Sequence, residues 1–333
     1  MKIVILGSGG WGTALANLLC ENGHEVTLWS YLKEECENLR KTGENPFLKG
    51  VKLHPAISYT NELSSVRFAE MVVMATPSFA VRTTAEKIRD HLPAGCILVS
   101  VTKGIEAGTS LRMSQILEEL TDNPVAVLSG PSHAEEVGRG VPTGCVAACR
   151  DQAVAELVQD TFMNDHFRVY ASDDVVGVEL GAALKNVIAL CAGVSDGMGC
   201  GDNTKALLMT RGLTEIARLG LALGSRKETF AGLTGVGDLI VTCTSMHSRN
   251  RRAGILIGQG KTPEEAMKEV GATVEGYYAA KSAWELAQKT GVDMPITAQA
   301  YAVLYEGKDP REALSILMTR TRQREVEDAA WEK

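Results

Sequence analysis

The chain has 333 residues, with 34 Lys and Arg against 41 Asp and Glu, so its formal net charge is −7. This acidic balance argues against a nucleic-acid-binding protein, because such proteins normally carry a basic stripe. Apolar residues make up 45% of the chain and aromatic residues 5%, a composition that excludes a disordered or collagen-like protein. Since a domain usually holds about 100–200 residues, the length predicts two domains.

The apolar segments and the cysteines point to a protein that is neither secreted nor inserted in a membrane. No apolar run reaches the roughly 18–20 residues of a membrane span. Glycines interrupt the apolar start, residues 1–6, too early for a signal peptide. The eight cysteines are scattered without a CxxC pair, and no two histidines have metal-ligand spacing. We therefore expect a reduced, cytoplasmic protein with no metal site and no stable membrane insertion.

Short β-type runs and helical stretches alternate through the first half of the chain. The β-type runs are 2–6, 25–29, 71–75, 97–101 and 125–129, with 143–148 and 167–170 as candidates for the last strands. Helical periodicity lies between them, at 13–21, 81–91 and 111–120. Because the strands are continuously apolar and alternate with helices, this pattern predicts an α/β domain with a parallel, doubly wound sheet.

The pattern changes near Asp173, after which helical periodicity dominates. The helical stretches are 175–194, 203–223, 262–270, 275–291, 297–306 and 310–318. N-cap signals mark three helix starts, at Ser132, Thr262 and Asp309, each with Glu at the third helical position. We predict a domain of residues 1–172 followed by an all-helical domain of residues 173–333. The charged end of the chain, 319–333, is predicted to form a solvated helix.

A glycine-rich loop follows the first predicted strand and opens the first predicted helix. Gly7-Ser8-Gly9-Gly10-Trp11-Gly12 has the GxGxxG pattern of Rossmann-type domains, and its place between strand and helix gives the pattern meaning. Gly7 permits a tight turn, Gly9 lets the backbone approach a pyrophosphate, and Gly12 lets helix and strand pack closely. The sequence therefore predicts a dinucleotide site. The alternative is a tight turn without a ligand.

In Rossmann-type domains, residues at the end of the second strand normally contact the ribose of the cofactor. NAD-specific sites usually have Asp or Glu about 20 residues after the loop, whereas residues 29–33 here are Trp-Ser-Tyr-Leu-Lys. Lys33 is placed to meet a 2′-phosphate, which favours NADP or the use of both NADP and NAD. The alternative is that Lys33 is simply solvated.

Two lysines stand where each can meet a ligand or a buried partner. Lys103 ends a predicted strand, so it should lie at the carboxyl edge of the sheet, where doubly wound folds bind ligands. Lys185 and Asn186 interrupt an otherwise small and apolar helix, and a buried lysine needs a partner or a purpose. Asp238, an acid in an apolar stretch, is a natural partner. The alternatives are a snorkelling Lys185 and a helix N-cap at Asp238.

Two further segments carry candidate binding residues. Ser132 follows a predicted strand in Gly130-Pro131-Ser132, where it is equally explained as a helix N-cap. The run Ser248-Arg249-Asn250-Arg251-Arg252 holds three arginines within four residues, which suits a phosphate through bidentate guanidinium bonds. The alternative is a solvated helix cap. No G-x-S-x-G elbow accompanies Ser132-His133, so no Ser-His-Asp nucleophile is predicted.

Taken together, these segments resemble the bacterial NAD(P)-dependent glycerol-3-phosphate dehydrogenase family. The matching segments span most of the chain in family order: GSGGWGTALA (7–16), VTKGIE (101–106), LSGPSHAEEV (128–137), FRVY (167–170), GVELGAALKNVIAL (177–190), SDGMGCGDN (195–203), TRGLTEIARLG (210–220), GLTGVGDLIVTCTSMHSRNRR (232–252), VEGY (274–277) and MPIT (294–297). The resemblance implies reversible NAD(P)H-dependent reduction of dihydroxyacetone phosphate to sn-glycerol 3-phosphate, which supplies phospholipid synthesis. By analogy with such two-domain enzymes, a homodimer is expected.

The resemblance also implies a role for individual residues, and Lys185 becomes the proton-transfer residue. The residues implied to hold the small phosphorylated substrate are Lys103, Gly130, Ser132, Lys185, Asp238, Ser248, Arg249 and Asn250. The residues implied to line the cofactor, NADP or NAD, are Gly10, Trp11, Tyr31, Lys103, Ala134, Arg249, Val274 and Glu275, beside Gly7, Gly9 and Gly12 of the loop. Asn186 and Thr242 match polar positions near the substrate in eukaryotic relatives.

Two other functions fit parts of the sequence. A dehydrogenase of the same two-domain type, acting on another hydroxy acid or on an acyl thioester, would share the glycine loop. The Arg249 cluster and the segment GDLIVTC (237–243) argue against it. A non-enzymatic dinucleotide sensor would also keep the loop, but it would not need Lys185, Asp238 and Arg249 together.

Overall fold

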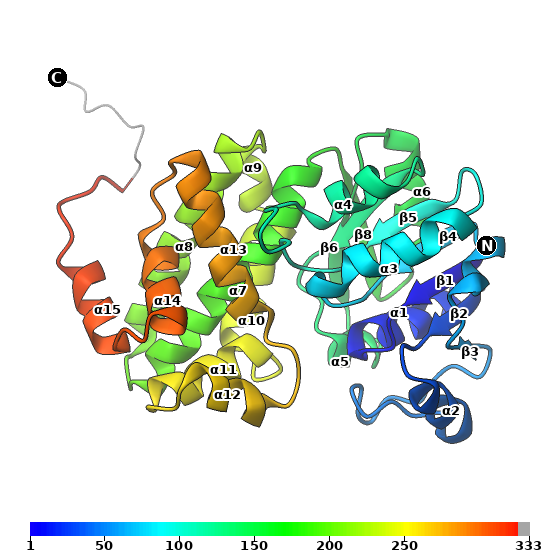
Figure 1. The fold of residues 1–333 in the computed structure, drawn as a ribbon, viewed down its shortest axis with the longest axis horizontal. Helices are drawn as coiled ribbons and strands as arrows, with labels where there is room; N and C mark the ends of the chain where they lie inside the picture. The colour runs from blue at the N-terminus through cyan, green and yellow to red at the C-terminus, as the bar shows by residue number, and fades with distance from the viewer. Residues whose placement is uncertain (326–333) are drawn as a thin grey trace.

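The structure is a computed structural model that describes residues 1–325, and its two halves lie side by side (Figure 1). The N-terminal half contains one eight-stranded sheet with the order β3-β2-β1-β4-β5-β6-β7-β8. The strands are β1 (Lys2–Leu6), β2 (Glu25–Trp29), β3 (Ser58–Thr60), β4 (Met71–Met74), β5 (Ile97–Ser100), β6 (Val125–Ser129), β7 (Thr143–Ala148) and β8 (Phe167–Ser172). The predicted fold class, a Rossmann-type sheet followed by helices, is confirmed.

One strand pair departs from the predicted parallel sheet, because β7 runs antiparallel to β6. The other strand pairs of the sheet are parallel. A parallel neighbour needs a crossover of a dozen or more residues, usually through a helix. The segment between β6 and β7 holds only a one-turn helix, α5 (Ala134–Val137), so the chain does not cross back and β7 returns in the opposite direction.

Helices cover both faces of the sheet because successive strand residues point to opposite sides. Ile3 and Ile5 of β1 pack in one core with α1, α5 and α6, whereas Val4 and Leu6 pack in another with α3 and α4. These helices are α1 (Gly10–Glu21), α2 (Lys33–Thr42), α3 (Val81–Ile88), α4 (Met113–Leu120) and α6 (Gln152–Phe162). The sequence did not predict α2, α6 or β3. Only Cys36 and Leu39 of α2 are buried, which leaves it a weak apolar stripe.

The C-terminal half is helical and is built around α7 (Val175–Gly197). The other helices are α8 (Asp202–Ala222), α9 (Lys227–Phe230), α10 (Asp238–Thr244), α11 (Arg249–Gly258), α12 (Pro263–Val270), α13 (Glu275–Thr290), α14 (Pro295–Tyr305) and α15 (Pro310–Met318). By length and composition α7 is apolar enough to cross a membrane, but 89% of its most apolar window is buried inside the fold. Such burial is what a central core helix shows.

The predicted helix ends are partly confirmed. Thr262 forms a capping box with Glu265, and Asp309 accepts hydrogen bonds from the backbone N–H groups of Arg311 and Glu312. The N-cap predicted at Ser132 is wrong, because the short helix there begins at Ala134 and the Ser132 hydroxyl donates to the carbonyl of Gly130. The helix predicted over 319–333 is wrong for residues 319–325, which are irregular, and its remainder lies outside the described residues.

A buried ion pair joins the two halves. Glu179 of α7 accepts a hydrogen bond from the Arg112 guanidinium, and its other oxygen accepts the backbone N–H of Ser114 at 2.8 Å. The Ser114 hydroxyl donates to the same carboxylate at 2.6 Å. Close by, Val175 and Val178 of α7 pack on Val127 and other residues of the sheet. Six residues after Glu179, Lys185 lies on the same helix, so this contact fixes the position of Lys185 relative to the sheet.

Helices α7 and α11 touch through their backbones. A Cβ atom on Gly193 would lie 2.1 Å from the carbonyl oxygen of Arg251, and one on Gly254 would lie 2.1 Å from the carbonyl oxygen of Leu190. Gly197 and Gly258 repeat the arrangement one turn further along each helix. Only glycine allows this approach. The start of α11, which carries Arg249, is therefore held close to the helix that carries Lys185.

Replacing Gly193 with alanine is expected to force α11 away from α7, because the new methyl group meets backbone that cannot move alone. Overpacking of this kind costs about 1–3 kcal/mol, so thermal unfolding followed by circular dichroism should shift down by several degrees. The matched control is Gly201→Ala, since a Cβ at Gly201 has nothing within 4 Å and the backbone there is extended. An unfolding temperature equal to that of the control would contradict the expectation.

Candidate functional site

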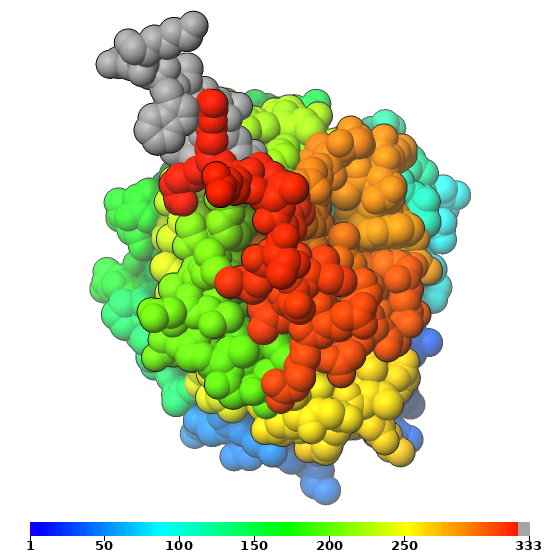
Figure 2. Space-filling view, turned by 90° about the vertical axis from the view of Figure 1, so that its left-hand side faces the viewer, coloured from blue at the N-terminus to red at the C-terminus, as the bar shows by residue number. Residues whose placement is uncertain are grey.

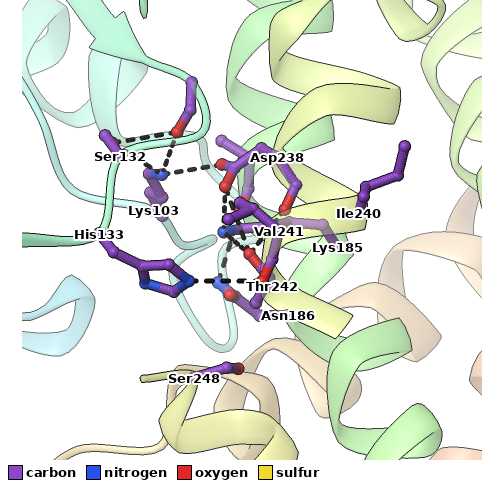
Figure 3. A network of polar contacts seen from close by, with 12 residues as sticks. Lys103, Ser132, His133, Lys185, Asn186, Asp238, Ile240, Val241, Thr242 and Ser248 are labelled. Atoms are coloured by element: carbon purple, nitrogen blue, oxygen red, sulfur yellow. Dashed lines mark hydrogen bonds and ion pairs between the residues drawn. The ribbon is translucent and has the colours of Figure 1, made fainter. Parts of the chain in front are cut away.

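A cluster of buried charged groups lies where the two halves meet. Lys103 follows β5 and Ser132 follows β6, both at the carboxyl edge of the sheet, whereas Lys185 comes from the middle of α7. Asp238 is the first residue of α10, directly after a π-type turn over 233–237. Figure 3 shows the two lysines converging on Asp238 from opposite sides. Residues that are 53 and 135 positions apart in the chain thus meet in one site.

Asp238 binds both lysines through separate oxygens. Its Oδ1 accepts Lys185 Nζ at 2.6 Å, and its Oδ2 accepts Lys103 Nζ at 2.8 Å. Lys185 also donates to Thr242 Oγ1 at 2.6 Å, and that hydroxyl donates in turn to the backbone carbonyl of Asp238. Lys103 donates to the carbonyl of Gly130 at 2.8 Å. The side chain of Asp238 is 1% exposed and that of Lys185 is 6% exposed, so water screens the pair little.

These contacts decide two alternatives that the sequence left open. Lys185 does not snorkel to solvent, since it is buried on α7, and Asp238 is not an N-cap but the partner of both lysines. Burial, together with the charge of Lys103, lowers the pKa of Lys185 to about 8, although Asp238 opposes the change. Burial alone would raise the pKa of Asp238, but the two ammonium groups outweigh burial and hold it below its usual value.

The start of α11 forms the other wall of the site. Ser248 caps this helix by accepting the backbone N–H of Arg251 at 3.2 Å, and the next residue, Arg249, is exposed. The Asn250 side chain donates to Asn186 Oδ1 on α7 and accepts the backbone N–H of Gly276 at the start of α13. The helix N-terminus, with its positive end of the helix dipole, and the Arg249 guanidinium are together suited to a phosphate.

The three arginines predicted as one cluster do not act together. Arg251 points back to Asp196, whose carboxylate lies 2.8–2.9 Å from its guanidinium, and it also donates to the carbonyl of Thr244. Arg249 is instead close enough to Glu275 to affect its carboxylate, whose pKa burial raises and Arg249 lowers. Of these two arginines, Arg249 is therefore the one near Glu275, at the contact between the two halves.

The glycine loop has the geometry of a phosphate cradle. Gly7 has φ +123°, a conformation that L side chains rarely adopt, and a Cβ on Gly12 would lie 2.0 Å from the carbonyl oxygen of Gly7. By contrast, nothing lies within 4 Å of a Cβ on Gly9. Beside the loop, Trp11 Nε1 and Thr76 Oγ1 are buried without a hydrogen-bond partner among the described residues. The free space at Gly9 and the two buried polar atoms without hydrogen-bond partners both fit a bound dinucleotide.

Comparisons with known proteins agree with this geometry over the whole chain. Residues 2–155 match the family described as NAD-dependent glycerol-3-phosphate dehydrogenase N-terminus, and residues 174–315 match the corresponding C-terminus. The glycerol-3-phosphate dehydrogenase (NAD(P)+) of Thermoanaerobacter sp. strain X514 is 54% identical over 327 residues, covering 98% of this chain and 99% of the relative. That of Moorella thermoacetica is 54% identical over 332 residues, covering 99% of both.

The chain belongs to the NAD-dependent glycerol-3-phosphate dehydrogenase family. Among solved structures, the glycerol-3-phosphate dehydrogenase of Coxiella burnetii superposes with a TM-score of 0.93 at 36% identity, covering 96% of this chain and 99% of that one. As a member of this family the protein is an NAD(P)-dependent oxidoreductase with a small-molecule substrate, and the resemblance seen in the sequence is confirmed. The rival interpretations, a different dehydrogenase type or a non-enzymatic sensor, are set aside by the same matches.

The dehydrogenase brings most of the residues singled out in the sequence to the space between its halves. The charged cluster itself, shown in Figure 3, contains Lys103, Gly130, Ser132, Lys185 and Asp238, which hydrogen bonds join. The start of α11 contains Ser248, Arg249 and Asn250, and the hydrogen bond from Asn250 to Asn186 joins it to α7. Those around the glycine loop include Gly10 and Ala134, whose Cβ positions would be 3.6 Å apart. Tyr31 lies apart from the cluster, 74% exposed at the end of β2, with its ring edge-on to Trp29. Lys33 is also exposed, 3.8 Å from Glu37.

Three residues of the cleft escaped the sequence analysis. Ser78, after β4, donates through its hydroxyl to Glu275 at 2.8 Å, so the two halves also meet at a predicted cofactor residue. Thr76 lies beside the glycine loop, and His133 lies against α10, where its Nε2 is 3.4 Å from the carbonyl of Val241. The sequence feature that could have identified Thr76 and Ser78 as site residues is their position just after a buried strand. Within residues 1–325 we find no group of three His, Cys, Asp or Glu side chains suited to a metal ion.

Proposed function

We propose that the enzyme reduces dihydroxyacetone phosphate to sn-glycerol 3-phosphate in this cleft, with NADPH or NADH as reductant, and runs in reverse with the oxidised cofactor. The observation that carries this proposal is the buried Lys185, whose Nζ lies 2.6 Å from Asp238 Oδ1. The next residue, Asn186, accepts a hydrogen bond from Asn250 at the start of α11, the helix that begins with Arg249. The relatives of the enzyme are named glycerol-3-phosphate dehydrogenase, which is the same activity. The product is a phospholipid precursor, so the reaction supplies lipid synthesis.

The proposed catalytic group is the ammonium of Lys185. When bound, the nicotinamide ring supplies the hydride for reduction at carbon 2. As the ketone oxygen gains negative charge, Lys185 stabilises and then protonates it, and in the reverse direction the neutral amine takes that proton back. Within the described chain, two protons of Lys185 are donated to Asp238 and Thr242, which leaves the third for the substrate oxygen. A pKa of about 8 allows both roles near neutral pH.

The proposed roles of the neighbours follow from their contacts. Asp238 fixes the direction of the Lys185 side chain and keeps its charge, while Lys103 offsets that carboxylate and lies beside Ser132. Arg249 and the backbone N–H groups at the start of α11, beside Ser248, hold the phosphate, and Asn250 keeps this helix start against α7. The binding energy of the phosphate then holds the carbonyl carbon in place for hydride transfer.

The experiment that tests this function is the oxidation of NADPH and of NADH, measured side by side with dihydroxyacetone phosphate. Turnover that depends on dihydroxyacetone phosphate is expected, with NADPH accepted at least as well as NADH, because no acid occupies the ribose-reading position at 29–33. A chiral assay of the product should give sn-glycerol 3-phosphate. Oxidation supported by 2-keto acids and not by dihydroxyacetone phosphate would contradict the proposal.

Three broader statements are also proposals. We propose residues 1–172 and 173–333 as the cofactor and substrate domains, supported by the end of β8 at Ser172 and the start of α7 at Val175.

We propose a homodimer formed by the helical half, supported by an apolar groove of about 670 Å³ between α7, α8, α14 and α15. Figure 2 shows that face, where the red segment crosses between green and orange helices. A cytoplasmic location is proposed from the free, mostly buried cysteines.

A further inference from the structure

The cationic side chains of the cleft are hydrogen-bond donors, and the two carboxylates there are already bound. In their charged forms Lys103, Lys185 and Arg249 only donate hydrogen bonds, as do the backbone N–H groups at a helix start. The Asp238 carboxylate is already bound to both lysines, and the Glu275 carboxylate accepts the backbone N–H and the hydroxyl of Ser78. Donors suit the phosphate and the ketone oxygen of the proposed substrate. The third polar group, the hydroxymethyl group, can accept from a donor, but it also needs an acceptor for its own proton.

His133 offers such an acceptor. It directly follows Ser132, is half-buried, and lies close enough to Lys185 and Lys103 for both to act on its charge (Figure 3). Its ring centroid is 5.9 Å from that of His247, the residue before the Ser248 cap of α11. His133 therefore lies between the proposed proton donor and the proposed phosphate site, which are the two ends between which the substrate must extend.

The surroundings of His133 select one protonation form. Its Nε2 faces the carbonyl oxygen of Val241, and because a carbonyl only accepts, Nε2 carries the hydrogen. Burial lowers the pKa of His133, Lys185 and Lys103 lower it further, and the Val241 carbonyl and Glu135 oppose the change. A neutral ring with hydrogen on Nε2 has a lone pair on Nδ1. No described residue donates to that nitrogen in the hydrogen bonds of the cleft.

We propose that His133 is a specificity-determining residue whose Nδ1 accepts the hydrogen bond of the substrate's free hydroxymethyl group. This inference rests on the proposed function, because it assumes a three-carbon ketone phosphate held between Lys185 and the start of α11. His133 does not take part in proton transfer to the ketone. Its role is to distinguish a substrate that ends in a hydroxymethyl group from one that ends in a methyl group.

The test compares dihydroxyacetone phosphate with acetol phosphate, which has a methyl group in place of the hydroxymethyl group. For the wild-type enzyme we expect kcat/KM to favour dihydroxyacetone phosphate. In His133→Phe this preference should fall by about five- to tenfold, the effect of one hydrogen bond, while kcat/KM for acetol phosphate stays within about threefold of wild type. His133→Asn, which keeps an oxygen acceptor near the Nδ1 position, should retain most of the preference.

The control variant is His91→Leu, at a histidine in the 3₁₀ helix Arg89–His91 on the outer side of the sheet domain, which should leave the preference unchanged. An unchanged preference in His133→Phe, or equal losses for both substrates, would overturn the inference about His133. If wild-type enzyme fails to reduce dihydroxyacetone phosphate at all, the proposed function fails instead. A circular dichroism spectrum of each variant identifies any loss that comes from misfolding, and His133→Asn then carries the comparison.

Discussion

Replacing Lys185 with alanine is expected to lower kcat for dihydroxyacetone phosphate reduction by about a thousandfold, within the range typical of general acid–base catalysis. The affinity for NADPH or NADH should stay within about twofold of wild type, because Lys185 lies in the helical half and contacts Asp238 and Thr242 rather than the glycine loop. Stopped-flow turnover and fluorescence titration of the reduced cofactor measure the two quantities separately.

Two companion variants separate lost chemistry from lost structure. Lys185→Met keeps the volume of the side chain and leaves Asp238 paired with Lys103, so it should be as inactive as Lys185→Ala although it leaves a smaller cavity. The matched control is Lys281→Ala, an exposed lysine on α13, which should retain wild-type kcat. In Lys185→Ala, a small primary amine added to the solution should restore part of the rate, since it can enter the vacated space and donate a proton.

The pH dependence of the reaction rate also tests the assignment of Lys185 as the proton-transfer residue. Burial lowers the pKa of Lys185 to about 8, so the ammonium form needed for ketone reduction predominates below pH 8 and is lost above it. The rate of reduction should therefore fall as the pH rises through 8, while glycerol 3-phosphate oxidation, which needs the neutral amine, should rise over the same interval. A near-normal kcat in Lys185→Ala, or the same pH profile in both directions, would contradict the role of Lys185.

The sequence predicted the chemistry of this cluster better than its exact geometry. A lysine inside a small, apolar helix and an acid in an apolar stretch each needed a partner, and the structure pairs Lys185 with Asp238. That Lys103 shares the same carboxylate depends on how the two halves meet, which no local pattern records. The contact between Ser78 and Glu275 was equally invisible, because it joins residues 197 positions apart.

For the fold as well, elements with a strong local pattern were predicted from the sequence, and elements that depend on contacts with other parts of the chain were not. Strong, continuous apolar strands such as β1 and β6 were predicted within a residue of their bounds, since their periodicity is local. The three-residue β3 and the charged α2 carry too little apolar signal. β3 is placed by pairing with β2, and α2 by its contact with β3. The antiparallel β7 follows a connection after β6 that holds only a one-turn helix. The N-cap expected at Ser132 failed because the Ser132 hydroxyl donates to the carbonyl of Gly130.

Replacing Arg249 with alanine is expected to raise KM for dihydroxyacetone phosphate by about 30- to 100-fold, the effect of a charge-assisted pair with a phosphate. Arg249 is the first helical residue of α11, so its guanidinium and the helix dipole act on the same region. For dihydroxyacetone without phosphate, kcat/KM should change by less than about threefold. Steady-state kinetics with both substrates at saturating cofactor give the comparison.

The matched control for Arg249→Ala replaces another arginine in the first turn of a helix. Arg311 is an exposed arginine in the first turn of α15, behind the Asp309 N-cap, so Arg311→Ala removes the same side chain at a helix start remote from the cleft. It should leave both substrates unaffected. Because α11 is held to α7 by glycine contacts and by Asn250, the loss in Arg249→Ala should come from the guanidinium and not from a moved helix. Equal losses with the phosphorylated and unphosphorylated substrates would contradict a phosphate role, since a guanidinium that binds phosphate cannot penalise a substrate lacking one.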